Sequence, residues 1–320
     1  MGRGMGIGLD DEALRVFANK GCADDSRIPQ RGNDNAVKVR RVMQLTSDLT
    51  GKPFSDLRIL DLACGEGVYS IEAGLRGAEV IGIDGRTERM QQGNAIAARL
   101  KLQRVRFEQQ DIRNVSQATH GAFDVVYLLG ILYHLHVPDV FNVLTNVRDL
   151  ARALVVIDTH IALRPETQAE HRGRTYAGRL FREHEDADEE AVRRARLLAS
   201  LDTTFSFWFT KPDIVRLLVD LGFTAVLEAH APLEPGKPDD RITLVAMKGE
   251  QFPLAAYPWI NDLSEDAIEE AISKRAAAAA GTHSQATEAV RPESRRQELA
   301  SLLNRILRRT FRVELKRVKR

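Results

Sequence analysis

The sequence lacks a cysteine pattern, a membrane-spanning apolar run and a signal peptide, which would mark a disulfide-rich or metal-binding, a membrane or a secreted protein. Its 320 residues include only two cysteines, which give neither a disulfide framework nor the spacing of a metal site. No apolar run approaches the roughly 20 residues that a membrane-spanning helix needs, and residues 1–14 lack the apolar core of a signal peptide. These absences favour a cytoplasmic protein, and 43% hydrophobic residues are ample for a large core.

Net charge is also almost absent, but the charged residues are unevenly distributed. The formal net charge is +1, yet residues 291–320 carry eleven Arg and Lys against three Glu. Apolar residues recur between them at helical spacing, which predicts a basic amphipathic helix. These are Leu299, Leu302, Leu303, Ile306, Leu307, Phe311, Leu315 and Val318. Such a helix can lie on an anionic membrane, follow a nucleic-acid backbone, or pack against a partner or its own domain.

The stretch from Arg58 to Asp84 has the pattern of a strand, a glycine turn, a helix and a second strand. Short apolar runs at both ends are typical of buried parallel strands. Gly65 and Gly67 allow the backbone to turn tightly into a helix over residues 68–76. Asp84 follows 19 positions after Gly65, where a carboxylate can reach a ribose diol. The pattern predicts the first half of a doubly wound, nucleotide-binding sheet.

Asp61 distinguishes between two classes of nucleotide. Dinucleotide sites use Gly-x-Gly-x-x-Gly, whereas here Ser70 takes the third position and Asp61 precedes the turn. A carboxylate there would repel a pyrophosphate but would attract the ammonium and sulfonium groups of S-adenosylmethionine. The series Asp61-x-Ala63-x-Gly65-x-Gly67 resembles motif I of the class I methyltransferases. The resemblance implies S-adenosyl-L-methionine as the cofactor, and we expect no metal.

Further elements follow in the order that this family requires. Strands are predicted at residues 105–109, 123–129, 153–157, 224–228 and 241–247, and helices at 139–150 and 211–221. The resemblance implies an α/β fold, a doubly wound, seven-stranded, mostly parallel sheet of order 3-2-1-4-5-7-6. We expect a helical insertion after the fifth strand and a helical C-terminal extension.

The resemblance also assigns the cofactor contacts. Asp84 would bind the ribose, the segment from Gln110 to Ile112 would contact the adenine edge, and the missing side chains of Gly65 and Gly67 would make room for the methionine part. The full implied set is Asp61, Ala63, Gly65, Gly67, Asp84, Gly85, Gln110, Asp111, Ile112 and Leu129.

An enzyme that transfers a methyl group mainly has to hold the acceptor in line with the methyl carbon and the sulfur, because the sulfonium already activates the methyl group. A hydroxyl or amine acceptor must still lose a proton. His134 and His160 follow the fourth and fifth strands and are the candidate bases, while the hydroxyl of Tyr133 is a candidate to orient the acceptor. A loop histidine that only bonds to the backbone is an equally open interpretation.

A narrower resemblance involves the segment from Gly130 to His134. It is similar to the Gly-x-Leu-Tyr-His segment of the wobble-uridine carboxymethyltransferases and their uncharacterised relatives, and Phe205 to Trp208 is similar to an aromatic stretch of related chains. Leu135 stands where the transfer-RNA enzymes carry an arginine, so the chain departs from them at that position.

Three regions are predicted along the chain. Residues 1–57 would form an N-terminal helical lid, with helices at 10–20 and 35–49. Residues 58–250 would form the methyltransferase core with a cap insertion at 161–202, and residues 251–320 a helical extension that ends in the basic tail. The arginines of the insertion either cap the substrate side or form salt bridges with the acidic run beside them.

These features predict methyl transfer to an oxygen or nitrogen of a small-molecule or glycan-like acceptor. One alternative is a methyltransferase that grips transfer RNA or other RNA through the basic tail. The other is a non-catalytic protein that binds S-adenosylmethionine for regulation. Peripheral membrane contact and the oligomeric state are left open, since fold does not fix partners.

The basic tail generates the first testable prediction. Deletion of residues 291–320 should leave S-adenosylmethionine affinity unchanged, because the charge, the apolar stripe and the linker before them all stand apart from the core. Binding to anionic vesicles or RNA should weaken, and the difference should shrink as salt rises. Calorimetry and co-sedimentation measure the two effects. A truncated protein that fails to fold would show that the tail belongs to the core.

Overall fold

The computed structural model describes residues 31–196 and 198–256. The chain divides into two compact units, Met1–Gln251 and Phe252–Arg320. The predicted helix at residues 10–20 and the basic tail at 291–320 fall outside the described ranges. Within the described ranges, no helix is both long enough and apolar enough to cross a bilayer.

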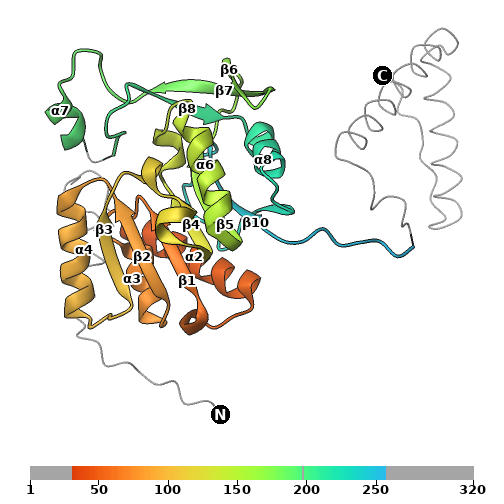
Figure 1. Ribbon diagram of the computed structural model, residues 1–320. Helices are drawn as coiled ribbons and strands as arrows, with labels where there is room; N and C mark the ends of the chain where they lie inside the picture. The colour runs from red at the N-terminus through yellow and green to blue at the C-terminus, as the bar shows by residue number, and fades with distance from the viewer. Residues whose placement is uncertain (1–30, 197, 257–320) are drawn as a thin grey trace, which may run out of the picture. The chain divides into compact units, whose positions relative to one another are not determined.

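The first unit is built on a seven-stranded sheet with the order β3-β2-β1-β4-β5-β10-β9 (Figure 1). Five strands are parallel, while β10 runs antiparallel to both of its neighbours. The strands are β1 (Arg58–Leu62), β2 (Glu79–Asp84), β3 (Val105–Gln109), β4 (Phe123–Leu129), β5 (Ala151–His160), β9 (Ala225–Glu228) and β10 (Arg241–Met247). The predicted fold class and strand order are confirmed.

Helices cover both faces of this sheet. One face carries α2 (Arg31–Thr50), α3 (Val68–Leu75) and α4 (Thr87–Arg99), and the other carries α6 (Asp139–Leu150) and α8 (Lys211–Asp220). Alternate residues of β4 face opposite ways, so that Val126 and Leu128 pack toward α6 while Val125 and Tyr127 pack toward α3. The shorter helices are α5 (Gln117–His120), α7 (Glu190–Ala195) and the single turns η1 (Phe54–Asp56), η2 (Ile112–Asn114) and η3 (Leu132–His134).

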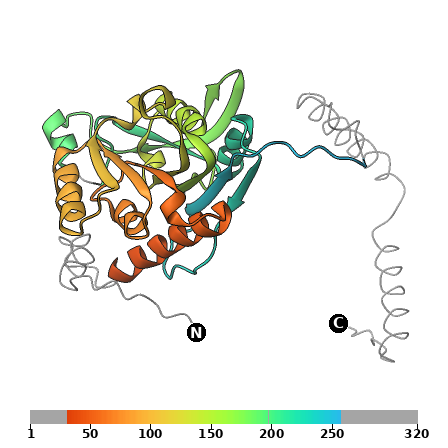
Figure 2. The ribbon, with the colours of Figure 1, turned by 60° about the horizontal axis from the view of Figure 1, so that its bottom comes forward.

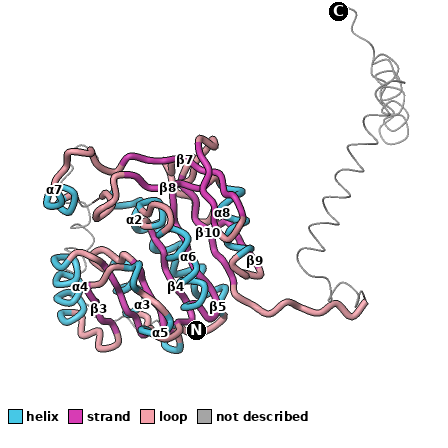
Figure 3. The backbone as a smooth tube through the Cα atoms, turned by 45° about the horizontal axis from the view of Figure 1, so that its top comes forward, coloured by secondary structure: helices cyan, strands magenta, loops and turns pink. Residues whose placement is uncertain are grey.

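The insertion is helical only at α7 (Glu190–Ala195), and the prediction of a helical insertion was wrong for the segment before it. The segment forms β6 (Thr167–His171) and β7 (Arg174–Arg182), which pair with β8 (Phe205–Phe209) in a three-stranded antiparallel sheet (Figure 3). Burial alternates along β7, since Tyr176 is buried and Thr175 is exposed, which is the period of a strand. Gly178 lets the strands approach, because a Cβ there would lie 2.3 Å from the Trp208 carbonyl oxygen. We call this sheet the cap sheet.

The second predicted helix of the lid, at residues 35–49, is α2, and it packs on the sheet (Figure 2). Its buried residues include Val42 and Met43, and the Thr46 hydroxyl lies 2.8 Å from the Tyr127 hydroxyl of β4. This part of α2 therefore contributes to the core. A lid over the cofactor stays a prediction for the residues before it.

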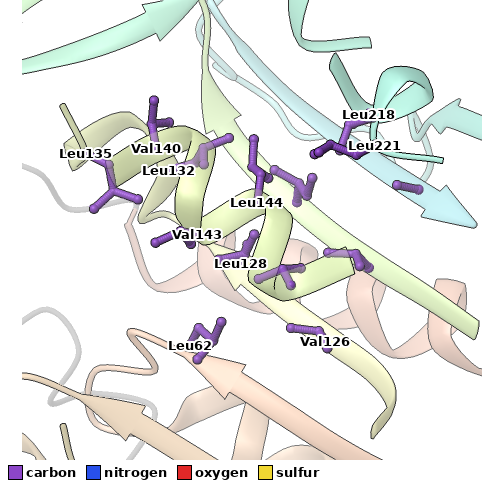
Figure 4. Packing of buried hydrophobic residues seen from close by; sticks show 14 of the residues in the cluster. Leu62, Val126, Leu128, Leu132, Leu135, Val140, Val143, Leu144, Leu218 and Leu221 are labelled. Carbon is purple, nitrogen blue, oxygen red and sulfur yellow. The ribbon is translucent and has the colours of Figure 1, made fainter. Parts of the chain in front are cut away.

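Leu144 generates a prediction of stability, because it is fully buried on α6 (Figure 4). Leu144→Ala should lower the free energy of unfolding by about 2–5 kcal/mol, through lost apolar burial and the cavity left behind. Urea denaturation followed by circular dichroism measures the change. The control is Asn142→Ala on the exposed side of the same helix, which should change stability by less than about 0.5 kcal/mol. Equal effects of the two variants would contradict the assigned packing.

Candidate active site

Asp61 occupies the end of β1 as a buried carboxyl group. It is 1% exposed and accepts a 2.7 Å hydrogen bond from the hydroxyl of Ser70 on α3. Burial raises the pKa of Asp61 to about 7, against the hydrogen bonds from Ser70, and the negative charge of Asp84 adds to the rise. A cation bound beside Asp61 would stabilise its ionised form. Ser70, which takes the place of the third glycine of a dinucleotide-binding motif, thus fixes the position of the Asp61 carboxyl group.

Asp84, at the end of β2, lies directly against the turn that follows β1. Its carboxylate accepts hydrogen bonds from the backbone amides of Gly65 (3.1 Å) and Arg86 (2.9 Å). Only 4% of Asp84 is exposed. The structure therefore brings Asp61, Gly65 and Asp84 together at the carboxyl edge of the sheet, as the sequence predicted.

Gly67 has a packing role that the sequence did not reveal. Its φ of +84° favours glycine, and a Cβ there would lie 2.3 Å from the ring of Phe107 on β3. The missing side chain therefore makes room for a core phenylalanine, and room for the methionine part of a cofactor stays a prediction. At Gly65 the neighbour is the guanidinium end of Arg89, 2.8 Å from a Cβ.

Asp111, in the segment predicted to contact the adenine, is held by Arg113 of η2. Arg113 donates to both carboxylate oxygens, with Nε 3.0 and 2.9 Å from Oδ1 and Oδ2, and also reaches Asp139 at 3.1 Å and Asp202 at 2.6 Å. Burial raises the pKa of Asp111, but the hydrogen bonds from Arg113 outweigh it and the net shift is downward. Asp111 is therefore ionised and already paired.

A small pocket of about 60 Å³ joins these acidic residues to His134. The predicted residues that line it are Ala63, Asp84, Gly85, Asp111, Ile112 and His134, and residues 199–203 close it from the insertion. Leu201 lies so close that a Cβ on Gly85 would be 2.5 Å from it. Small-molecule pockets measure roughly 300–1,000 Å³, so a nucleoside requires Leu201 to move aside.

Five of the predicted cofactor contacts do not line this pocket, namely Asp61, Gly65, Gly67, Gln110 and Leu129. The side chain of Gln110 donates to the carbonyl oxygen of Asn114 at 3.3 Å, and its backbone amide donates to the carbonyl oxygen of Asp84. Leu129 packs in the core on the α3 face. Their direct contact with a cofactor stays a prediction.

His134, on η3, forms a pair with Glu183 that the sequence did not reveal. Its Nδ1 lies 2.9 and 3.0 Å from the two carboxylate oxygens. Glu183 also accepts bonds from the hydroxyl of Ser206 (2.8 Å) and the amide of Ser200 (3.1 Å). Burial opposes ionisation of Glu183, yet the hydrogen bonds from His134 and Ser206 lower its pKa overall. In the neutral form of the ring, Nδ1 therefore carries the proton, which leaves the lone pair on Nε2.

His160, at the end of β5, forms a second pair, with Asp240. Its Nδ1 lies 2.9 Å from the carboxylate, and its Nε2 accepts from Arg241 at 3.3 Å. Burial lowers the pKa of His160, with Asp240 opposing and the charge of Arg241 adding to the shift. His160 is therefore neutral at neutral pH. Arg241 itself is anchored on Asp158, with Nε 2.6 Å from the carboxylate.

Tyr133 lies between the two histidines. Its ring centroid is 4.3 Å from that of His134 and 4.7 Å from that of His160. Trp208 of the cap sheet donates to the Tyr133 carbonyl oxygen at 2.9 Å. Burial raises the pKa of Tyr133, against the charge of Arg241, so that its hydroxyl stays protonated at neutral pH. The three predicted catalytic residues thus form one cluster.

Residues 53–180 match a family of methyltransferase domains. The chain carries a class I methyltransferase domain. It is 27% identical over 46% of its length to a magnesium-protoporphyrin O-methyltransferase of Rhodobacter capsulatus, and 25% identical over 37% to a ubiquinone biosynthesis O-methyltransferase of Acinetobacter baumannii (strain AYE). The matches span 64% and 47% of those relatives.

The same fold is present in a solved structure of the N-terminal domain of EvdMO1 with SAH bound. That match has a TM-score of 0.54 and 18% identity, and it covers 75% of this chain and 98% of that one. At this identity the likeness concerns the fold alone. The narrower resemblance to the wobble-uridine carboxymethyltransferases stays a prediction.

The His134–Glu183 pair generates a prediction about tautomers. In the wild type, His134 should carry its neutral-form proton on Nδ1, because only a donor satisfies the carboxylate. Glu183→Gln should reduce that preference, since an amide can donate as well as accept. Imidazole ¹⁵N chemical shifts report the tautomer directly. The control is Glu185→Gln at an exposed position nearby, and an unchanged tautomer in Glu183→Gln would contradict the assigned role.

Proposed function

We propose that this protein transfers the methyl group of S-adenosylmethionine to an oxygen or nitrogen of a small-molecule acceptor. The observation that carries the proposal is the buried carboxyl of Asp61 on β1, which lies near enough to Asp84 at the end of the neighbouring strand β2 for the charge of Asp84 to raise its pKa. A buried carboxylate favours a cationic ligand and disfavours a pyrophosphate. The cytoplasm stays the proposed location.

The chain's own residues suggest how the cofactor would be held. Asp61 would attract the ammonium of the methionine part, and Asp84 would accept hydrogen bonds from the ribose hydroxyls. The loop residue Ala63, with a φ of +55°, lies between them and lines the pocket. When bound, the cofactor supplies an activated methyl group.

His134 is the proposed base. Its ring lines the same small pocket as Asp84 and Asp111, and Glu183 orients it with the Nε2 lone pair available. In the described chain, Nε2 of His134 has no hydrogen-bond partner, whereas Nε2 of His160 already accepts from Arg241. A neutral imidazole with a free lone pair can remove the acceptor's proton as the methyl group transfers.

The relatives support a small acceptor. Their names state O-methylation of magnesium protoporphyrin and in ubiquinone biosynthesis. A cavity of about 730 Å³ beyond β5 and β10 offers room for a molecule of drug size, and Arg241 joins it to Tyr133 and His160. We propose this cavity as the acceptor site.

Asp84 generates the prediction for cofactor binding. Asp84→Asn should weaken S-adenosylmethionine binding by about 2 kcal/mol, or roughly 30-fold, because the charged acceptor for two ribose hydroxyls is lost. Asp84→Ala should weaken it at least as much, since the Gly65 turn also loses its anchor. Calorimetry measures both. Asp56→Ala, an exposed change before β1, should bind like the wild type, and equal affinities throughout would remove Asp84 from the site.

A transfer assay tests the activity itself. The protein is incubated with methyl-labelled S-adenosylmethionine and cell extract separated into RNA, lipid, saccharide and small-molecule pools. Label is expected in the small-molecule pool and is expected to fall in His134→Ala. Label in RNA would support the RNA-modifying alternative, and binding without any transfer would support a regulatory protein.

A further inference from the structure

The cavity of about 730 Å³ has walls from several elements. It lies past the end of β5 and the start of β10, between β7 of the cap sheet and the beginning of α8. Apolar side chains supply much of its wall, namely Ile161, Ala162, Leu163, Pro165, Ala177 and Ile242. No residue is shared with the small pocket beside Asp84. An apolar body of a bound molecule would fit against this wall.

Charged side chains of the cavity are mostly neutralised by one another. Lys211 forms an ion pair with Glu228. Asp213 pairs with Arg216 outside the cavity at 2.6 Å, and Arg241 is anchored on Asp158. These pairs leave little unbalanced charge to select a ligand.

Lys237 is the exception. Within residues 31–196 and 198–256, its ammonium makes no hydrogen bond or ion pair, although the side chain is partly buried. Burial lowers the pKa of Lys237, and the positive charge of Arg41 adds to the shift, while the carboxylates of Asp158 and Glu234 oppose it without forming an ion pair with the lysine. Asp239, also in the cavity and without a charged partner in these ranges, is exposed, so water stabilises it. A partly desolvated ammonium without a counter-ion gains most from an anionic ligand.

We propose that the acceptor is a small molecule with an apolar body and an acid group, and that Lys237 binds this group at the mouth of the cavity. The inference rests on the proposed methyltransferase function, because it names the class of acceptor. A carboxylate at Lys237 can come from two sources, the acceptor or the methionine part of the cofactor. The experiment separates them.

The test uses the full chain and two matched dyes. 8-Anilinonaphthalene-1-sulfonate is apolar and anionic, whereas N-phenyl-1-naphthylamine has the same body without charge. Fluorescence titration measures both, and calorimetry measures S-adenosylmethionine affinity for each variant. Lys237→Gln removes the charge, Lys237→Arg retains it, and Lys211→Gln removes a paired lysine of the same cavity. Ala177→Phe fills the cavity and shows whether the dyes bind there.

We expect Lys237→Gln to weaken the anionic dye about tenfold or more, as loss of a charged hydrogen bond would, and to leave the neutral dye within about twofold. Lys237→Arg and Lys211→Gln should bind both dyes like the wild type. Ala177→Phe should weaken both dyes, and S-adenosylmethionine affinity should be unchanged in every variant.

Three results would overturn the proposal. Loss of S-adenosylmethionine affinity in Lys237→Gln, with normal dye binding, would assign the lysine to the cofactor. Equal loss of both dyes would show that charge does not select the ligand, and dye binding that survives Ala177→Phe would place the dyes elsewhere. Failure of S-adenosylmethionine to bind the wild-type protein would instead reject the proposed function, whatever the dyes do.

Discussion

Burial of the Asp61 carboxyl is the constraint on which the rest of the site depends. A carboxyl group at the end of a central strand, with Asp84 on the next strand, is costly to ionise, and its pKa rises to about 7. The hydroxyl and the backbone amide of Ser70 compensate only in part. Two acidic groups at one edge of the sheet therefore store an unfavourable interaction that a bound cation relieves.

Hydrogen bonds join the cap sheet to the segment that follows β4 of the Rossmann-like sheet. The amide of Phe207 donates to the carbonyl oxygen of Leu135 at 2.8 Å, which ties β8 to the segment after β4. The next residue along the strand, Trp208, holds the Tyr133 carbonyl, and Glu183 orients His134 from the end of β7. The main sheet supplies the acidic residues and the histidines, while residues of the cap sheet and the segment after it bond to the predicted catalytic cluster and orient it.

Local patterns predicted the main sheet, because apolar runs and glycine turns are properties of adjacent residues. The strand from Phe123 to Leu129 and the helix from Asp139 to Leu150 have the bounds that the sequence indicated. In the insertion, helical structure was expected, whereas Thr167–His171 and Arg174–Arg182 form strands. The alternation of burial along β7 is visible only in the structure.

Partners that lie far apart in the sequence could not be predicted in the same way. Glu183 is 49 residues from His134, and Asp240 is 80 residues from His160. The spacing of residue types along the sequence does not predict such a pair, because the partners meet only when the cap sheet and β10 have folded against the strands that carry the histidines. Gly67 illustrates the same limit, because no local pattern predicts that the ring of Phe107 packs where a side chain at Gly67 would lie.

The two histidine–carboxylate pairs differ in what surrounds their second nitrogen. Arg241 donates to Nε2 of His160, and its charge also lowers the pKa of that ring, so His160 is suited to accept a hydrogen bond and poorly suited to hold an extra proton. His134 has Glu183 on one side and the small pocket on the other, with no arginine at Nε2 in the described chain. An imidazolium formed at His134 would therefore be stabilised by the carboxylate behind it. These surroundings agree with the proposal that His134 removes the proton while His160, with Arg241 and Tyr133, orients the acceptor.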